Sequence, residues 1–144
     1  MTLQTILKNK PPGFISVSSE VRIGGVISVL AEKRIGAVLV MDGQNKLIGI
    51  LSERDIVRSL ARHAASTLDL TAAQLMTKNP VSADPATTVA KAMEIMTDGR
   101  FRHLPVMENG KLIGLVSIGD VVKAKIDQSE YEVESLRTYV VGGV

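Results

Sequence analysis

The sequence contains no cysteine, no tryptophan and few aromatic residues of any kind. The lack of cysteine excludes a disulfide framework, a thiolate nucleophile and a cysteine-ligated zinc site. The aromatic share of 3% is too small for a platform on which nucleic-acid bases could stack. The 17 basic and 15 acidic residues nearly cancel to a formal net charge of +2, so no basic face is indicated. We therefore expect no nucleic-acid partner.

Long hydrophobic runs are also missing. The longest runs, such as residues 37–41, have the length of a strand and fall far short of a membrane span. The N-terminal residues lack the apolar core of a secretory signal. We therefore expect a cytoplasmic protein that does not associate with a membrane.

Groups that could perform catalysis are scarce. Neither the phosphate-binding pattern G-x-x-x-x-G-K-[ST] nor the dinucleotide pattern G-x-G-x-x-G occurs in the sequence. Two histidines without any cysteine do not indicate a metal site, and His103 has no obvious acid–base partner. We therefore expect neither a metal site nor enzymatic activity.

The sequence does contain an internal repeat, which is interpreted before any single motif. Lys46–Gly49 recurs as Lys111–Gly114, 65 positions later. The apolar face of one predicted helix recurs 66 positions later as the face of another: Ile23, Val26, Ile27, Leu30 and Val89, Ala92, Met93, Met96. Each repeat predicts the element order β-α-β-β-α. We expect a mixed α/β (α+β) fold in which two such repeats pack with pseudo-twofold symmetry.

Three segments are expected along the chain. Residues 1–66 form the first repeat with an N-terminal helix, and residues 67–128 form the second repeat with a short linker helix. Residues 129–144 form an amphipathic extension with Tyr131, Val133, Leu136, Tyr139 and Val140 in a loose helical pattern. This extension has no counterpart after the first repeat, so it either covers a core face or docks on a partner subunit.

Each repeat ends in the same polar motif, where a strand is predicted to run into a helix. Ser52 and Asp55 form this motif in the first repeat, and Ser117 and Asp120 form it in the second. A helix N-terminus attracts phosphate, a serine hydroxyl adds a hydrogen bond, and an aspartate can accept both hydroxyls of a ribose. The pattern S-x-x-D is also that of a helix capping box, in which the two side chains bind only the amides of their own helix.

The two copies differ in the residues around the motif. Arg100, Arg102 and His103 precede the second motif, and the arginine fork suits phosphate oxygens. The corresponding segment of the first copy, Gly36–Leu39, carries no charge, although Arg54 lies inside the first motif. We therefore expect the site completed by Asp120 to bind phosphate better than the site completed by Asp55.

The doubled β-α-β-β-α plan, the two Gly-h-h-Ser-x-x-Asp endings and the Arg102–Val106 run resemble a tandem pair of CBS (cystathionine β-synthase) domains, also called a Bateman module. The resemblance covers roughly residues 10–127. It implies clefts between the repeats that bind AMP, ADP, ATP, NAD(H) or S-adenosylmethionine. It also implies that two modules form a homodimer.

The resemblance further implies roles for particular residues. Asp55 and Asp120 would hold ribose hydroxyls, and Ser52 and Ser117 would contact ribose or phosphate. Phosphate would be faced by Arg100, Arg102 and His103. From its place inside the first motif, Arg54 is also expected to reach a phosphate in either site. The adenine slots would be lined by Ser16, Val17, Val38, Ser82, Ala83 and Leu104.

These observations together predict a regulatory sensor that binds an adenine nucleotide and responds with a change of conformation or partner affinity. The pair is expected to stand alone and to act through a regulated enzyme or transporter. The alternative is a nucleic-acid or protein-interaction module in which both S-x-x-D motifs are only helix caps.

Overall fold

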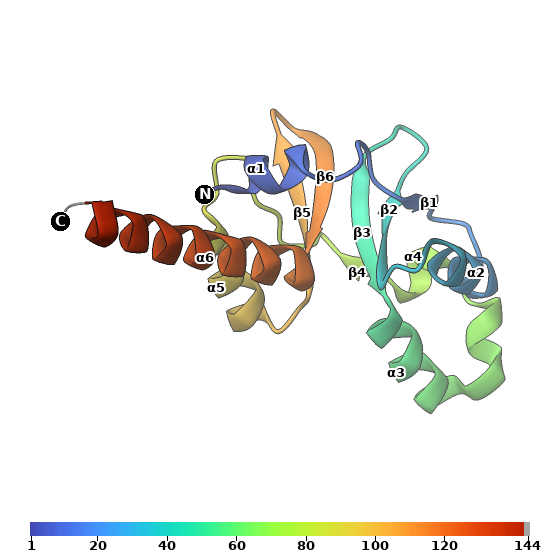
Figure 1. The fold of residues 1–144 in the computed structure, drawn as a ribbon. Helices are drawn as coiled ribbons and strands as arrows, with labels where there is room; N and C mark the ends of the chain where they lie inside the picture. Colours follow the sequence, from blue (N-terminus) through green and yellow to red (C-terminus); the bar gives the residue numbers. More distant parts are fainter. Residues whose placement is uncertain (143–144) are drawn as a thin grey trace. The chain divides into compact units, whose positions relative to one another are not determined.

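The structure of the protein is a computed structural model, which describes residues 1–142. The chain divides into two compact units, one of which combines the N-terminal segment with the C-terminal half of the chain (Figure 1). The first-repeat unit comprises Gly13–Val81, and the second-repeat unit comprises Met1–Pro12 together with the chain from Ser82 onward. Both units combine helices with a sheet, which confirms the mixed α/β class.

The first-repeat unit is built on a four-stranded sheet of order β1-β2-β3-β4. β1 pairs with β2 in parallel, whereas the β2–β3 and β3–β4 pairs are antiparallel. The elements of this unit are β1 (Ser16–Ser18), α2 (Ile23–Lys33), β2 (Ala37–Met41), β3 (Leu47–Ser52), α3 (Glu53–His63), the 3₁₀ helix η1 (Ala64–Asp69), α4 (Ala72–Leu75) and β4 (Thr77–Lys78).

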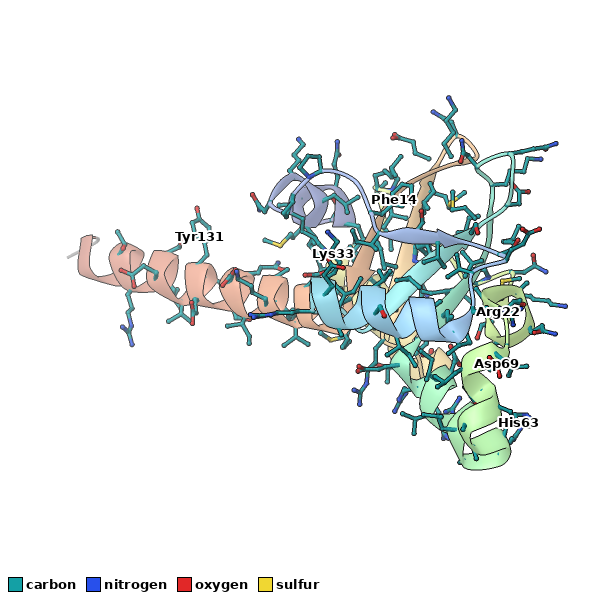
Figure 2. All side chains as sticks on the ribbon, turned by 90° about the vertical axis from the view of Figure 1, so that its right-hand side faces the viewer. Phe14, Arg22, Lys33, His63, Asp69 and Tyr131 are labelled. Carbon is teal, nitrogen blue, oxygen red and sulfur yellow. The ribbon has the colours of Figure 1, made fainter. Side chains whose placement is uncertain are left out.

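The core of the first-repeat unit lies where the apolar face of α2 meets the sheet. Ile23, Val26 and Leu30 are buried at the helical spacing predicted from the sequence. They cluster with buried residues of the sheet, of which Val38 and Leu51 have no exposed surface. The segment after α3 is held to the start of α2 by Arg22, whose guanidinium donates to the Asp69 carbonyl at 2.7 Å (Figure 2).

The second-repeat unit contains α1 (Leu3–Lys8), α5 (Val89–Gly99), the antiparallel strands β5 (His103–Glu108) and β6 (Lys111–Ser117), and α6 (Ile118–Gly142). The β5–β6 turn is built at Asn109 and Gly110, which both have positive φ, as a tight hairpin requires.

A strand was expected near Ser82 and Ala83, and the second-repeat unit has only one parallel bridge there, from Ala83 to Val106. The first-repeat unit shows the reason. In that unit the Leu39 amide donates to the Ile15 carbonyl at 3.2 Å and extends the β1–β2 pairing. The residue equivalent to Leu39 in the second repeat is Pro105, which has no amide hydrogen and cannot make this bond.

The N-terminal helix and the linker helix do not pack where the sequence suggested. Helix α1 was assigned to the first repeat, but Leu3 and Ile6 are buried in the core of the second-repeat unit. The linker helix α4 was assigned to the second repeat, but Ala72 is buried in the core of the first-repeat unit. Amphipathic periodicity shows that a helix has an apolar face, but not which core that face covers. That the sequence repeats extend over residues 1–66 and 67–128 remains a prediction.

The boundary expected at residue 129 is absent, because α6 continues without a break from Ile118 to Gly142. Between Asp120 and Val141 the sequence has neither proline nor glycine, so nothing interrupts the helical hydrogen bonds. The last two residues of the expected extension lie outside the described residues. Among residues 1–142, no helix has both the length and the apolarity needed to cross a membrane.

Gly49→Ala is expected to lower the free energy of unfolding by about 1–3 kcal/mol. A Cβ at residue 49 would overlap the Met76 side chain and would lie 2.9 Å from the Thr77 carbonyl oxygen, which belongs to rigid backbone. Gly114→Ala is the matched variant in the other repeat. The three atoms nearest to its Cβ all belong to the Leu7 side chain, which can rotate away, so its loss should be smaller. Urea unfolding of both variants measures the difference, and equal losses would contradict this explanation.

Candidate functional site

The first strand-to-helix junction lies where β3 ends and α3 begins. Ser52 is the N-cap of α3, and the Asp55 amide donates to its hydroxyl oxygen at 3.3 Å. The Asp55 carboxylate accepts from the Ser52 amide at 2.9 Å, which completes a capping box. The Ser52 hydroxyl also lies 3.1 Å from the same carboxylate oxygen, Oδ2. The motif therefore caps its own helix, as the alternative interpretation held.

The second junction, between β6 and α6, has the same reciprocal hydrogen bonds. The Asp120 amide donates to the Ser117 hydroxyl oxygen at 3.1 Å, and the Ser117 amide donates to Asp120 Oδ2 at 2.8 Å. At neither junction does Oδ1 of the aspartate accept one of these hydrogen bonds. A carboxylate has several lone-pair sites, so capping leaves acceptor capacity for a ligand hydroxyl.

Each junction has the same backbone hydrogen bond to the loop before its hairpin, so residues of the two repeats can be matched. The Glu53 amide donates to the Gly36 carbonyl at 2.9 Å, and the Ile118 amide donates to the Arg102 carbonyl at 2.8 Å. The second repeat therefore places an arginine where the first places a glycine. His103 lies directly across the β5–β6 ladder from Ser117, whereas Ala37 lies across from Ser52. The charge asymmetry predicted from the sequence thus occurs at equivalent positions in space.

Lys10 distinguishes the second junction further. Its ammonium lies 2.7 Å from Asp120 Oδ2 and also donates to the Leu115 carbonyl at 2.9 Å. Partial burial acts to raise the pKa of Asp120, but the hydrogen bonds from Lys10 and from the Ser117 amide outweigh it. The pKa of Asp120 therefore lies below its ordinary value, and the group is a carboxylate at neutral pH.

A pocket of about 370 Å³ opens beside this ion pair, within the range of roughly 300–1,000 Å³ typical of small-molecule sites. It lies between α1 and the first turns of α6. Lys10 and Lys123 bring positive charge to its wall, and Asp120 and Asp127 bring negative charge. The remaining lining residues are Met1, Thr5, Ile6, Asn9 and Ala124.

Of the residues singled out in the sequence, only Asp120 lines this pocket. Arg102 is exposed in the loop before β5, and Arg100 is the left-handed C-cap of α5 with φ 56°. Arg54 is exposed in the first turn of α3. Ser16 and Ser82 are exposed in the segments that precede the two hairpins.

Three residues predicted to line adenine slots are buried in the hydrophobic cores. Val38 and Leu104 have no exposed surface, and Val17 is 8% exposed. Their side chains pack among the core residues of their own units and support the sheets. Their role in lining an adenine slot stays a prediction. Alternation along a short apolar strand does not reveal which of its positions remain accessible.

Sequence reasoning missed Lys10, Asn9 and Lys123. No motif marks Lys10 and Asn9, because they lie more than a hundred positions before Asp120 along the chain. Lys123 lies near Asp120 but belongs to no motif. In the sequence, Lys10 is recognisable only as a basic residue between the end of α1 and Pro11. The packing of α1 on the second-repeat unit is what brings Lys10 to Asp120.

Lys10→Met is expected to raise the pKa of Asp120 toward its ordinary value, because the nearest cation is removed. The carboxylate stabilises the fold above its unfolded pKa of about 3.9, and this contribution is lost as the pH falls through the lower folded-state pKa. Since Lys10 and Asp120 are 35% and 26% exposed, the ion pair should contribute at most about 1 kcal/mol. A carboxyl NMR titration measures the pKa, and exposed Lys8→Met is the control. An unchanged Asp120 pKa in Lys10→Met would contradict the assignment.

Comparison with known proteins gives a consistent result. The CBS domain model matches residues 9–62 and 72–127. The CBS domain-containing protein CBSX3, mitochondrial, of Arabidopsis thaliana is 38% identical over 69% of this chain and 50% of its own length. The match covers about half the length of some curated relatives and less than a fifth of others.

Two solved structures are similar over most of the chain. The CBS-domain containing protein ATU1752 from Agrobacterium tumefaciens is 43% identical with a TM-score of 0.84, and the match covers 86% of this chain and 92% of that one. The CBS domain protein PAE2072 from Pyrobaculum aerophilum, complexed with AMP, is 29% identical with a TM-score of 0.74 over 83% of this chain and 89% of that one. With the family model matching both repeats, this chain belongs to the CBS domain family and carries its tandem pair.

Proposed function

We propose that this protein is a regulatory module that binds an adenine nucleotide, with AMP as the first candidate, at the junction of β6 and α6. The supporting observation is that a relative of the same fold is complexed with AMP, while this chain holds an ionised aspartate at the start of α6 beside a pocket. ADP, ATP, NAD(H) and S-adenosylmethionine share the adenosine part and are the other candidates.

In this proposal Asp120 binds the ribose. Its Oδ2 is held by the Ser117 amide and by Lys10, which orients the carboxylate, and Oδ1 accepts hydrogen bonds from the ribose diol. The low pKa of Asp120 keeps the group an acceptor at neutral pH. Ser117 keeps its capping role, so binding does not require the helix to lose its cap.

Lys10 and Lys123 bind the phosphate. Both line the pocket, and both ammonium groups can donate to phosphate oxygens. Lys10 must then share its hydrogen bonds between Asp120 and the phosphate. Lys10 directly follows the C-cap of α1. A change in its hydrogen bonds when the ligand binds would therefore affect the end of α1. A ligand changes the conformation only through a difference in affinity for the two states, and the Lys10 exchange supplies such a difference.

The junction of β3 and α3 forms a second, weaker site in this proposal. Asp55 is available in the same capping geometry, but Gly36 and Ala37 replace the arginine and histidine of the other repeat. Arg54, which lies within the Ser52–Asp55 motif, would bind the phosphate at this site. Arg100, Arg102 and His103 remain proposed phosphate contacts of the stronger site, with Ser82 and Ala83 near the base.

The output of the module passes to another molecule. We propose a homodimer whose partner affinity changes with occupancy, and a regulated enzyme or transporter as the receiver. No catalytic step is assigned to this chain.

Binding of AMP is expected to stabilise the protein by about 2.7 kcal/mol at one hundred times the dissociation constant, which raises the melting temperature by several degrees. Asp120→Asn should remove most of this shift, because the amide can still accept from the Ser117 amide but binds the ribose diol poorly. Asp55→Asn is the matched control and should remove little. Calorimetric titration of the three proteins with AMP, ATP, NADH and S-adenosylmethionine measures the affinities.

Lys10→Met separates the two parts of the ligand. The variant should lose more affinity for AMP than for adenosine, because only AMP carries the phosphate, whereas both ligands bind Asp120, which Lys10 helps to orient. The proposal is wrong if no adenosyl compound shifts the melting temperature. Stabilisation that is unchanged in Asp120→Asn and lost in Asp55→Asn would move the site to the other repeat.

A further inference from the structure

Helix α6 continues well past the second-repeat core (Figure 1), and this part of the helix carries exposed apolar residues. The last core residue of the helix is Ala124, and every residue from 129 to 138 is exposed. Val122, Ile126, Val133 and Leu136 are 40%, 52%, 52% and 63% exposed. An exposed apolar stripe on a projecting helix is unfavourable in water unless a partner covers it.

The stripe has the spacing of a coiled-coil seam. Ile126 and Val133 are seven residues apart, as are Val122, Ser129 and Leu136, and the two sets alternate by four and three. In heptad terms Ile126 and Val133 occupy a, and Val122, Ser129 and Leu136 occupy d. β-Branched residues at both a positions with Leu136 at one d position are in line with a two-stranded parallel coiled coil, while Ser129 forms one polar d layer. The most exposed of these large apolar residues, Tyr131 at 74%, occupies f, which is outside the seam in the heptad assignment.

The charged residues beside the seam match those of a second copy of the same helix. Lys125 and Glu132 occupy g, and Glu130 and Arg137 occupy e. In a parallel pair in register, each g residue lies beside the e residue five positions later on the other helix. Lys125 therefore meets Glu130 of the second copy, and Glu132 meets Arg137 of the second copy. By symmetry both attractive pairs form twice.

Antiparallel pairing is less favourable for this sequence. An antiparallel register that sets Leu136 against Ile126 of the second copy brings Glu130 beside the second Glu130 and Lys123 beside Arg137. A shift of one heptad in either direction relieves this repulsion. One shift sets Leu136 against Gly119, which has no side chain to pack, and the other pairs only Leu136 with Val133 among the a and d residues of the segment. The parallel register keeps the charge pairs and also sets every a and d residue of the segment against its counterpart.

We propose that residues 122–137 of α6 bind the same segment of a second copy of this chain as a parallel, in-register two-stranded coiled coil. The proposal specifies which element joins the proposed homodimer. Lys123, Ala124 and Asp127 of this segment line the pocket, but none of them occupies a or d. Variants that leave these three residues unchanged therefore test dimerisation separately from AMP binding.

Cysteine cross-linking gives the direct test, because the natural chain has no cysteine. In a parallel pair Leu136→Cys places two thiols face to face, so the full chain should form a disulfide-linked dimer under mild oxidation at low micromolar concentration. Tyr131→Cys is the matched control and should stay largely monomeric on a reducing-agent-free gel. In the antiparallel register described above, residue 136 of one copy would face residue 126 of the other, so the two thiols would be too far apart to cross-link. Equal cross-linking of the two variants, or none in Leu136→Cys, overturns the proposal.

Charge reversal tests the register in the absence of any cross-link. Lys125→Glu and Glu130→Lys should each weaken the dimer about tenfold in sedimentation equilibrium. The double variant Lys125→Glu/Glu130→Lys restores the pair in reverse and should recover the affinity. Glu134→Lys, outside the seam, is the control and should leave the affinity unchanged. A double variant weaker than either single variant, or a dimer that none of the changes affects, overturns the parallel seam.

Discussion

The reciprocal hydrogen bonds between a strand-ending serine and an aspartate one turn into the next helix are the constraint on which both units depend. At each junction they satisfy helix amides that have no partner within the helix. They also determine where the helix begins and where its carboxylate lies. The same interaction that stabilises α3 and α6 therefore presents a carboxylate at a helix N-terminus. A capping role and a ligand role are compatible, because Oδ2 accepts the capping bonds while Oδ1 accepts none of them.

What separates the two junctions is the surrounding structure and not the motif itself. Asp120 has Lys10 at 2.7 Å, with Arg102 and His103 on the adjoining strand end. The corresponding positions beside Ser52 are a glycine and an alanine. Positive charge next to Asp120 suits a phosphate and lowers the pKa of the carboxylate. The two repeats thus share one backbone geometry but differ in electrostatics.

Each repeat also needs a segment that precedes the other repeat in the chain. Helix α1 supplies Leu3 and Ile6 to the second-repeat core, and α4 supplies Ala72 to the first-repeat core. The equivalent glycines of the two repeats show this arrangement, since Gly114 lies against Leu7 and Gly49 lies against Met76. Because α1 ends next to Lys10, the helix that completes the second core also reaches the Asp120 site. Asp120 lies in the first turn of α6, and the later part of the same helix carries the exposed apolar residues.

The sequence by itself determined the β-α-β-β-α order of the first repeat, the α-β-β-α order that follows in the second, the helix start at each Ser-x-x-Asp motif and the greater charge of the second junction. These features are local, since they depend on apolar periodicity and on residues a few positions apart. Only the tertiary structure decided that α1 covers the second core, that Lys10 pairs with Asp120, and that Val38 and Leu104 are closed to solvent. The missing strand beside Pro105 likewise follows from a hydrogen bond to a distant segment. Periodicity identifies an apolar face, but contacts between residues far apart in the chain depend on how the whole core packs.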